Sequence, residues 1–145
     1  MKNILIAIDF DEHTENFVQF TAQFAQAFDA KLWLIHIASE EPDFLGYHEG
    51  PQYIRDMFAK ELREDHKKLQ AICDKLKATG LNAEGLMIQG PTIQMIIEEA
   101  KKLKIDLIIT GSQKRSFFYK AFIGSVSEAI VDEANLPVLV VPVGA

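Results

Sequence analysis

The residues best suited to chemistry follow an apolar run near the C-terminal end of the sequence. Gly111 comes directly after the run Ile105–Thr110, and Gly124-Ser125 opens a later helical pattern. The first turn of a helix has unpaired N–H groups and a partial positive charge, and glycine lets a phosphate approach them. The segment between the two glycines holds cations and no acid: Lys114, Arg115 and Lys120. This order of residues suits the phosphate tail of a nucleotide.

The same residues also have a purely structural explanation. Ser125-x-x-Glu128 is a capping box that satisfies a helix start without any ligand. Loop lysines and arginines are usually solvated. The segment is not a Walker A loop, because no Gly-Lys-Ser/Thr follows a four-residue spacer. Phosphate binding and an ordinary capped connection both stay open on spacing alone.

Asp9 is the second candidate, because it follows the first apolar run, Asn3–Ile8. A carboxylate there can accept hydrogen bonds from a base or a ribose, or hold a metal. No Gly-x-Gly-x-x-Gly fingerprint follows that run. Asp11, two residues on, can instead cap the helix that follows.

Other chemistries find little support in the sequence. The four histidines have no metal-ligand spacing to one another. His36 lies in a strand-like run and is interpreted as a hydrogen-bonded core residue. Cys73, the single cysteine, excludes an internal disulfide and is interpreted as a small packed hydrophobe. No serine has a Gly-x-Ser-x-Gly frame and no Cys–His pairing is indicated, so the sequence offers no catalytic nucleophile. We expect a protein that is not an enzyme, with a weak ATPase activity left open.

Size and charge narrow the class of protein. A chain of 145 residues is expected to form a single domain, 1–145. A net charge of −6 argues against nucleic-acid binding. No apolar stretch is long enough to span a membrane. The N-terminus leads straight into a strand-like run, which favours a cytoplasmic protein.

Apolar runs alternate with helical periods along the whole chain. Four of the five runs are nearly continuous in Ile, Leu and Val, which is typical of parallel strands covered on both faces. The predicted strands are Asn3–Ile8, Leu32–Ile37, Ala83–Ile88, Ile105–Thr110 and Val138–Val141. Helical spacing joins Phe17 to Phe28, Ile54 to Leu76, Ile93 to Ala100, and Val126, Ile130 and Ala134. Such an order predicts an α/β open sheet that binds ligands beyond the carboxyl ends of its strands.

Several stretches resemble the single-domain universal stress proteins. They are ILIAIDFDEHTEN, LWLIHI, QGPTIQMIIEEAKKLKIDLIITGS and FIGSVSEAIVDEANLPVLVVPV. The resemblance implies a five-stranded parallel open sheet with helices on both faces, Rossmann-like and similar to the adenine nucleotide alpha hydrolases.

The nucleotide-binding branch of that family carries the motif Gly-x2-Gly-x9-Gly-Ser/Thr. Gly111, Gly124 and Ser125 match it, but Lys114 stands at the middle glycine. A lysine side chain there either blocks the site or supplies a compensating charge to a phosphate. With three of four positions kept, the resemblance favours binding.

The resemblance also implies a set of site residues and partners. It places Ala7, Ile8 and Asp9 beside the adenine and ribose, with Ile37 as a wall for the base. Around the ribose and phosphates it places Thr110, Gly111, Gln113, Lys114, Gly124, Ser125, Val126 and Ser127. The implied ligand is ATP or AMP, with Mg²⁺ accompanying ATP. The implied assembly is a homodimer through the last strand, within residues 136–143.

Three functions follow from this reading. The first is a stress-response protein that binds ATP or AMP as a sensor or regulator. The second is a dimeric interaction module of the same fold, with Lys114 disabling nucleotide binding. The third is a slow ATP hydrolase that needs a metal near Asp9. A stability gain from added ATP separates the first from the second, and phosphate release identifies the third.

Overall fold

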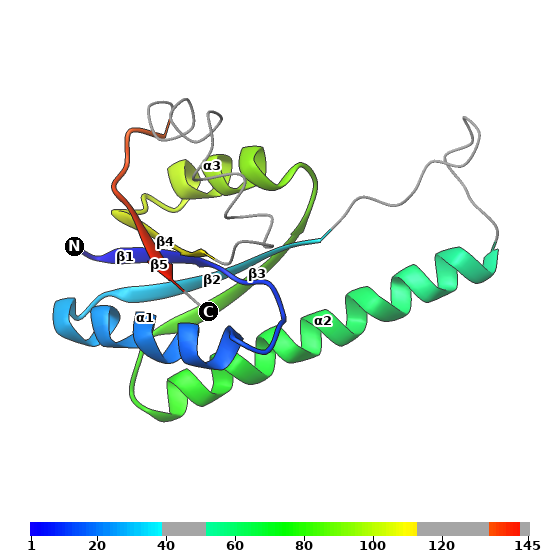
Figure 1. Ribbon diagram of the computed structural model, residues 1–145, viewed down its shortest axis with the longest axis horizontal. Helices are drawn as coiled ribbons and strands as arrows, with labels where there is room; N and C mark the ends of the chain where they lie inside the picture. The colour runs from blue at the N-terminus through cyan, green and yellow to red at the C-terminus, as the bar shows by residue number, and fades with distance from the viewer. Residues whose placement is uncertain (39–51, 113–133, 143–145) are drawn as a thin grey trace.

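Five parallel strands form one sheet in the computed structural model, which describes residues 1–38, 52–112 and 134–142. The strands run in the order β3-β2-β1-β4-β5 (Figure 1). Their bounds are β1 (Asn3–Ala7), β2 (Lys31–Ala38), β3 (Ala83–Gln89), β4 (Leu107–Ser112) and β5 (Val138–Pro142). The predicted α/β fold with a parallel sheet is confirmed.

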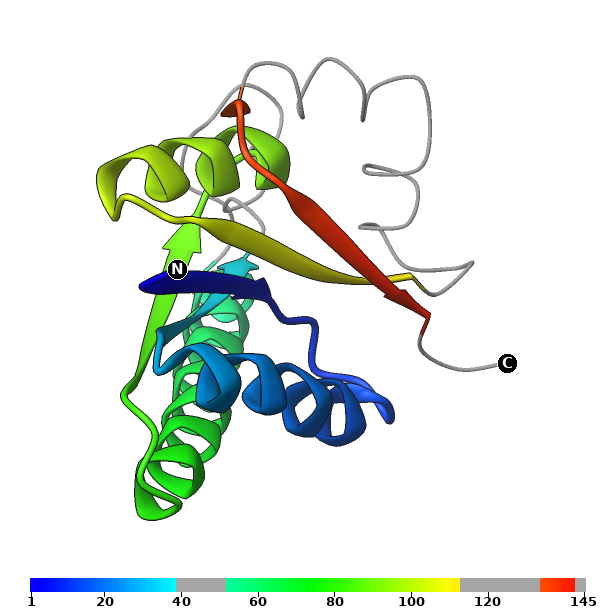
Figure 2. The ribbon, with the colours of Figure 1, turned by 90° about the vertical axis from the view of Figure 1, so that its left-hand side faces the viewer.

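Helices cover both faces of this sheet. They are α1 (Thr14–Phe28), α2 (Gln52–Ala78) and α3 (Thr92–Lys102). Figures 1 and 2 show α1 and α2 on one face and α3 on the other. The helix predicted around Val126 and Ile130 and the loop expected at 39–50 lie outside the described residues.

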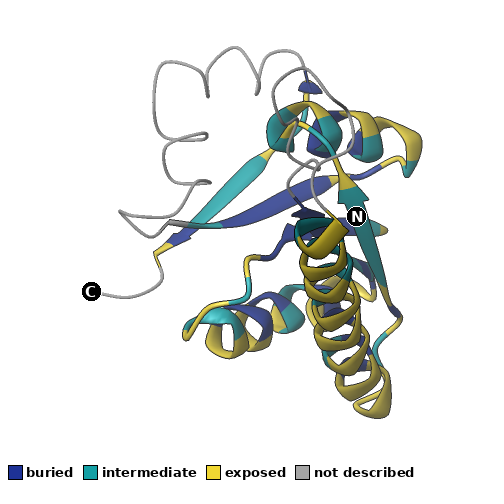
Figure 3. Ribbon diagram, turned by 90° about the vertical axis from the view of Figure 1, so that its right-hand side faces the viewer, coloured by how far each residue is buried: buried dark blue, intermediate teal, exposed yellow. Residues whose placement is uncertain are grey.

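The core consists of two apolar layers, one on each face of the sheet. Alternate side chains of a strand point to opposite faces, so Ile4 and Ile6 pack under α1 and α2, and Leu5 packs under α3. All three are fully buried. Figure 3 shows β4 buried, the edge strands β3 and β5 mostly intermediate, and the outer sides of the helices exposed. Cover on both faces explains why the strand sequences are nearly continuous in apolar residues.

Helix α2 extends well past the sheet (Figure 1). Its 27 residues correspond to about 40 Å at a rise of about 1.5 Å per residue. The buried residues Leu69, Cys73 and Leu76 all lie in its C-terminal part. Near its start, Tyr53 and Met57 are exposed. Cys73 is only 1% exposed, which confirms its interpretation as a packed hydrophobe.

The fourth strand lies two residues later than predicted. β4 begins at Leu107 instead of Ile105 and continues through Gly111 to Ser112. Pairing with β5 sets this boundary, because Gly111 lies opposite Val141 and Ser112 lies opposite Pro142. Gly111 is therefore a strand residue, and the expectation that it follows the strand is wrong.

Candidate functional site

The direction in which the chain builds the sheet reverses between β1 and β4. From β1 the chain adds β2 and β3 on one side and then returns to add β4 and β5 on the other. In open α/β sheets, ligands bind outside the carboxyl ends of the strands at such a point. The residues there are Ala7 at the end of β1, Ile8 and Asp9 just after it, and Thr110, Gly111 and Ser112 at the end of β4. We call this region the switch point.

The predicted site residues of the switch point divide between the two faces of the sheet. Ala7 and Ile37 pack in the layer beneath α3, and both are buried. Thr110 shares that face with Ile108, two residues earlier, and follows the β1–β4 pair Ile6–Ile109 by one residue. The Ile8 side chain instead packs beneath α1 and α2. Ile8 therefore presents its backbone, not its side chain, to this edge.

The Thr110 side chain is buried without a hydrogen-bond partner. The residue is 1% exposed, and its Oγ1 is the one fully buried side-chain polar atom among the described residues that has no partner. Thr21, which is equally buried, donates from Oγ1 to the Val18 carbonyl at 2.9 Å. Burying an unpaired hydroxyl costs about 1–3 kcal/mol. An orphaned hydroxyl at the switch point fits a site that a polar ligand completes.

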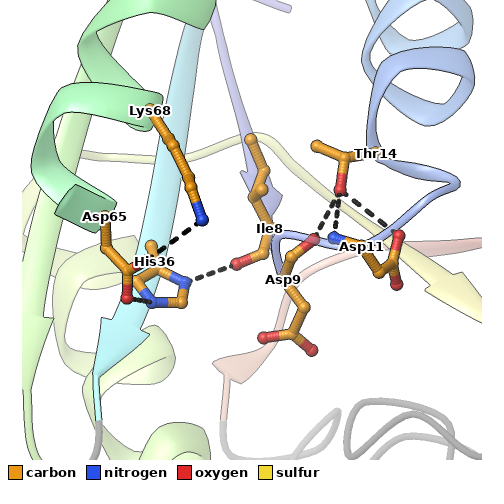
Figure 4. Close-up of polar contacts among 7 residues, drawn as sticks. All are labelled: Ile8, Asp9, Asp11, Thr14, His36, Asp65 and Lys68. Carbon is orange, nitrogen blue, oxygen red and sulfur yellow. Dashed lines mark hydrogen bonds and ion pairs between the residues drawn. The ribbon is translucent and has the colours of Figure 1, made fainter. Parts of the chain in front are cut away.

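Asp9 presents a carboxylate that pairs with no residue in the described part of the chain. Its backbone carbonyl is fixed, since it accepts a 2.6 Å bond from the Thr14 hydroxyl (Figure 4). The residue is exposed, yet surrounding protein removes part of the water shell of the carboxylate. That desolvation raises the pKa of Asp9, the charge of His36 opposes the rise, and Asp11 adds to it. A raised pKa at a ligand edge is a common mark of a functional carboxylate.

The β1–α1 turn is held by its own polar contacts. Asp11 N–H donates to Thr14 Oγ1 at 2.9 Å, and His13 N–H donates to Asp11 Oδ1 at 2.9 Å. Asp11 was predicted to cap α1. Its carboxylate does bond a backbone N–H just ahead of that helix, although His13 occupies the N-cap position.

His36 lies on β2 beside the switch point, with acceptors at both ring nitrogens (Figure 4). Nδ1 donates to the Ile8 carbonyl at 2.8 Å, because a carbonyl can only accept. Nε2 lies 3.5 Å from the Asp65 carboxylate on α2. The Phe10 ring packs against the imidazole, with a centroid separation of 4.6 Å. The interpretation of His36 as a hydrogen-bonded core residue is confirmed, but the sequence did not indicate Asp65 as its neighbour.

The remaining predicted site residues lie outside the described part of the chain. They are Gln113, Lys114, Gly124, Ser125, Val126 and Ser127. Their assignment to the phosphates stays a prediction. No group of three metal-binding side chains occurs among residues 1–38, 52–112 and 134–142. No helix in the same residues is long and apolar enough to cross a bilayer.

A hollow lined by described residues opens beside the β1–α1 turn, on the α1 and α2 face of the sheet. It is a groove of about 760 Å³ between α1 and α2, with apolar walls that include Val18, Ile72 and Leu76. Phe10 and Asp11 of the β1–α1 turn, and Thr14 at the start of α1, also line it. Volume alone would favour this groove as a binding site. The partnerless Thr110 and Asp9 favour the switch point, because polar ligands need such groups.

This strand order defines a doubly wound open α/β sheet. The model of the universal stress protein family matches residues 1–142. The chain belongs to this family.

Individual relatives align with this chain along nearly its whole length. The universal stress protein from the QAH/OAS sulfhydrylase 3′ region of Thermus aquaticus is 31% identical over 141 residues, covering 97% of this chain and 98% of that protein. The solved structure of MJ0577 from Methanocaldococcus jannaschii superposes with a TM-score of 0.75 at 25% identity, covering 97% and 95% of the two chains. A family protein from Arabidopsis thaliana with AMP bound superposes with a TM-score of 0.68 at 19% identity, covering 100% and 94%.

Proposed function

We propose that this protein binds ATP or AMP at the switch point and acts as a stress-response sensor or regulator. The observation that carries the proposal is a pair of partnerless polar groups at the carboxyl ends of the neighbouring strands β1 and β4. The Asp9 carboxylate and the buried Thr110 hydroxyl both lack a partner among the described residues. A ligand with several hydroxyl and amino groups, such as a nucleoside, satisfies both.

The chemistry of the edge suits the parts of a nucleotide. Ala7 and Ile37 give a buried apolar surface on the α3 face, which is suited to the flat side of a base. A carboxylate such as Asp9 accepts hydrogen bonds from ribose hydroxyls or an exocyclic amine. The phosphates are assigned by sequence to the segment from Lys114 to Ser127. Mg²⁺ bound with ATP would be held chiefly by phosphate oxygens and water, as this ion usually is.

Family members support an adenine nucleotide as the ligand. Besides the Arabidopsis protein with AMP, solved relatives are in complex with dAMP and with cAMP. We propose binding without turnover; hydrolysis would need a metal near Asp9 and a positioned water, since water is the nucleophile that attacks ATP. The interaction module without nucleotide stays the alternative if Lys114 blocks the site. The slow hydrolase is the second alternative.

We further propose a homodimer through the last strand. β5 lies at one edge of the sheet, where only β4 pairs with it among the described strands. A free strand edge can pair with a second copy across a two-fold axis. The cytoplasmic location expected from the sequence stays a prediction.

A thermal melt with and without ATP–Mg²⁺ tests the binding proposal. A ligand that binds only the folded state at about 100 times its Kd adds roughly 2.7 kcal/mol to the free energy of unfolding. We expect a rise in the melting temperature for the wild type, and no rise for Gly124→Asp, which places a carboxylate where phosphate is expected. No rise in the wild type at millimolar ATP would favour the interaction module. Phosphate release that disappears in Asp9→Ala would favour the hydrolase.

A further inference from the structure

Both backbone polar groups of Ile8 are hydrogen-bonded to residues of β2. The Ile8 N–H donates to the Ile35 carbonyl at 2.8 Å, although β1 itself ends at Ala7. The Ile8 carbonyl then accepts from His36 Nδ1 at 2.8 Å. A side chain of β2 therefore holds β1 in place one residue beyond its last regular strand residue.

This contact determines the direction of the Asp9 backbone. The peptide is planar and trans, so the N–H of Asp9 points opposite to the Ile8 carbonyl and away from His36. The next carbonyl, that of Asp9, is held by Thr14. With a hydrogen bond on either side of its Cα, Asp9 has little freedom to turn, and its carboxylate is kept at the switch point (Figure 4).

The imidazole is in turn held by α2. Asp65 lies 3.5 Å from Nε2, with its side chain 29% exposed, and Lys68 lies 3.9 Å from the same carboxyl group. The His36 side chain is only 11% exposed, and Phe10 packs against its ring. A ring with this little space has one orientation, in which Nδ1 faces Ile8.

We infer that His36, oriented by Asp65, is a positioning residue for the nucleotide site. It touches no ligand itself. It acts through the Ile8 carbonyl, and it holds Asp9 where the nucleoside is expected to bind. This inference rests on the proposed nucleotide binding, and it adds a residue that contributes to affinity from outside the site.

Three variants separate this role from simple core packing. His36→Leu removes the hydrogen bond and keeps a buried apolar side chain. His36→Asn keeps a donor, because the side-chain amide nitrogen of asparagine lies close to the place of histidine Nδ1. His66→Leu is the matched control, because His66 is an exposed histidine on α2. Calorimetric titration with AMP and with inorganic tripolyphosphate then measures the nucleoside and phosphate parts of the site separately, at a temperature where each variant is folded.

We expect His36→Leu to weaken AMP binding about tenfold, while His36→Asn and His66→Leu stay within about twofold of the wild type. Tripolyphosphate affinity should be equal in all four proteins, because Asp9 faces the nucleoside. Equal AMP affinity in wild type and His36→Leu would overturn the inference and leave the binding function intact. A loss in His36→Asn as large as in His36→Leu would also overturn it, by pointing to packing. No AMP binding by the wild type would overturn the binding function itself.

Discussion

The carboxylate of Asp106 accepts a 2.8 Å hydrogen bond from the backbone N–H of Lys2, 104 residues earlier in the sequence. The same Oδ2 accepts a second bond, of 2.9 Å, from Asn3 N–H. Asp106 stands just before β4, and Lys2 and Asn3 stand at the start of β1. One exposed carboxylate therefore aligns the amino ends of the two strands whose carboxyl ends form the switch point.

Because of Asp106, we expect the protein to lose stability at low pH. The two backbone hydrogen bonds lower the pKa of Asp106 in the folded protein. The unfolded chain then binds more protons in the window below about pH 3.9, so stability falls as pH falls through the folded pKa. Because the group is exposed, we expect Asp106→Asn to cost only about 0.5–1 kcal/mol at neutral pH. Denaturant unfolding at pH 7 and pH 3 checks both; a difference between the proteins that grows on acidification would contradict the assignment.

We expect the Thr110 hydroxyl to lower the stability of the free protein and to strengthen ligand binding. Thr110→Val removes a buried hydroxyl that has no partner among the described residues, so the free energy of unfolding should rise by about 1 kcal/mol without ligand. AMP binding should weaken in the same variant. Thr21→Val is the control: it deletes a hydroxyl bonded to Val18 and should lower the free energy of unfolding by about 1 kcal/mol. Equal losses in the two variants would mean that the Thr110 hydroxyl is already satisfied.

We expect the contribution of Asp9 to stability to depend on pH in the opposite direction to that of Asp106. Desolvation raises its pKa, so the folded protein binds more protons than the unfolded chain between about pH 3.9 and the folded pKa. Its contribution to stability is therefore lost as pH rises through that window. We expect Asp9→Asn to melt at a higher temperature than the wild type at pH 7 and to bind AMP poorly.

Asp29→Asn is the control for Asp9. Asp29 follows α1 at its far end in the left-handed conformation, which asparagine also tolerates. This variant should leave both melting temperature and affinity near wild type. Unchanged AMP affinity in Asp9→Asn would exclude the carboxylate from the site.

The contact between β3 and α2 leaves no room for a side chain at Gly85. A Cβ at this position would lie 2.9 Å from Leu69 Cγ and 3.0 Å from Cys73 Sγ. We expect Gly85→Ala to cost about 1–3 kcal/mol by overpacking. A double-mutant cycle with Leu69→Ala checks the contact by chemical denaturation, because the added methyl should cost less once Leu69 is truncated. Strict additivity would show that α2 is free to move away from β3.

The position of β5 at the edge of the sheet allows the proposed homodimer to be tested by a substitution. Val140 on β5 is half-buried and packs in neither of the two apolar layers formed by the described residues. Val140→Lys places a charge on the edge proposed for dimer contact, so sedimentation should show a monomer where the wild type is a dimer. Phe28→Lys, at an exposed site on α1, should leave the dimer intact. A dimer that survives Val140→Lys would move the interface elsewhere.

The arrangement of the sheet could be predicted from the sequence because its strands carry a strong signal. Runs such as Asn3–Ile8 and Leu32–Ile37 are apolar on both faces, and only a sheet covered by helices on both sides buries them. The end of β4 could not be predicted, because Gly111 and Ser112 become strand residues only through pairing with β5. Strand ends depend on partners far away in the sequence.

The candidate site was predictable only in part for a similar reason. Asp9 was found because a carboxylate directly follows an apolar run. Asp65 was missed, since it stands in a densely charged stretch of helix where nothing separates it from solvated neighbours. Its contact with His36 arises from the way α2 crosses the sheet. Likewise, only the assembled sheet reveals that the buried Thr110 hydroxyl has no partner among the described residues.

The Cys73 thiol, packed where α2 contacts β3, can be used to detect the separation of α2 from the sheet. Cys73 is the only thiol in the chain and is 1% exposed, and burial raises its pKa, so little of the reactive thiolate forms in the native state. An alkylating reagent can reach it only when α2 separates from the sheet. The rate of labelling in unmodified protein therefore follows the population of that open state.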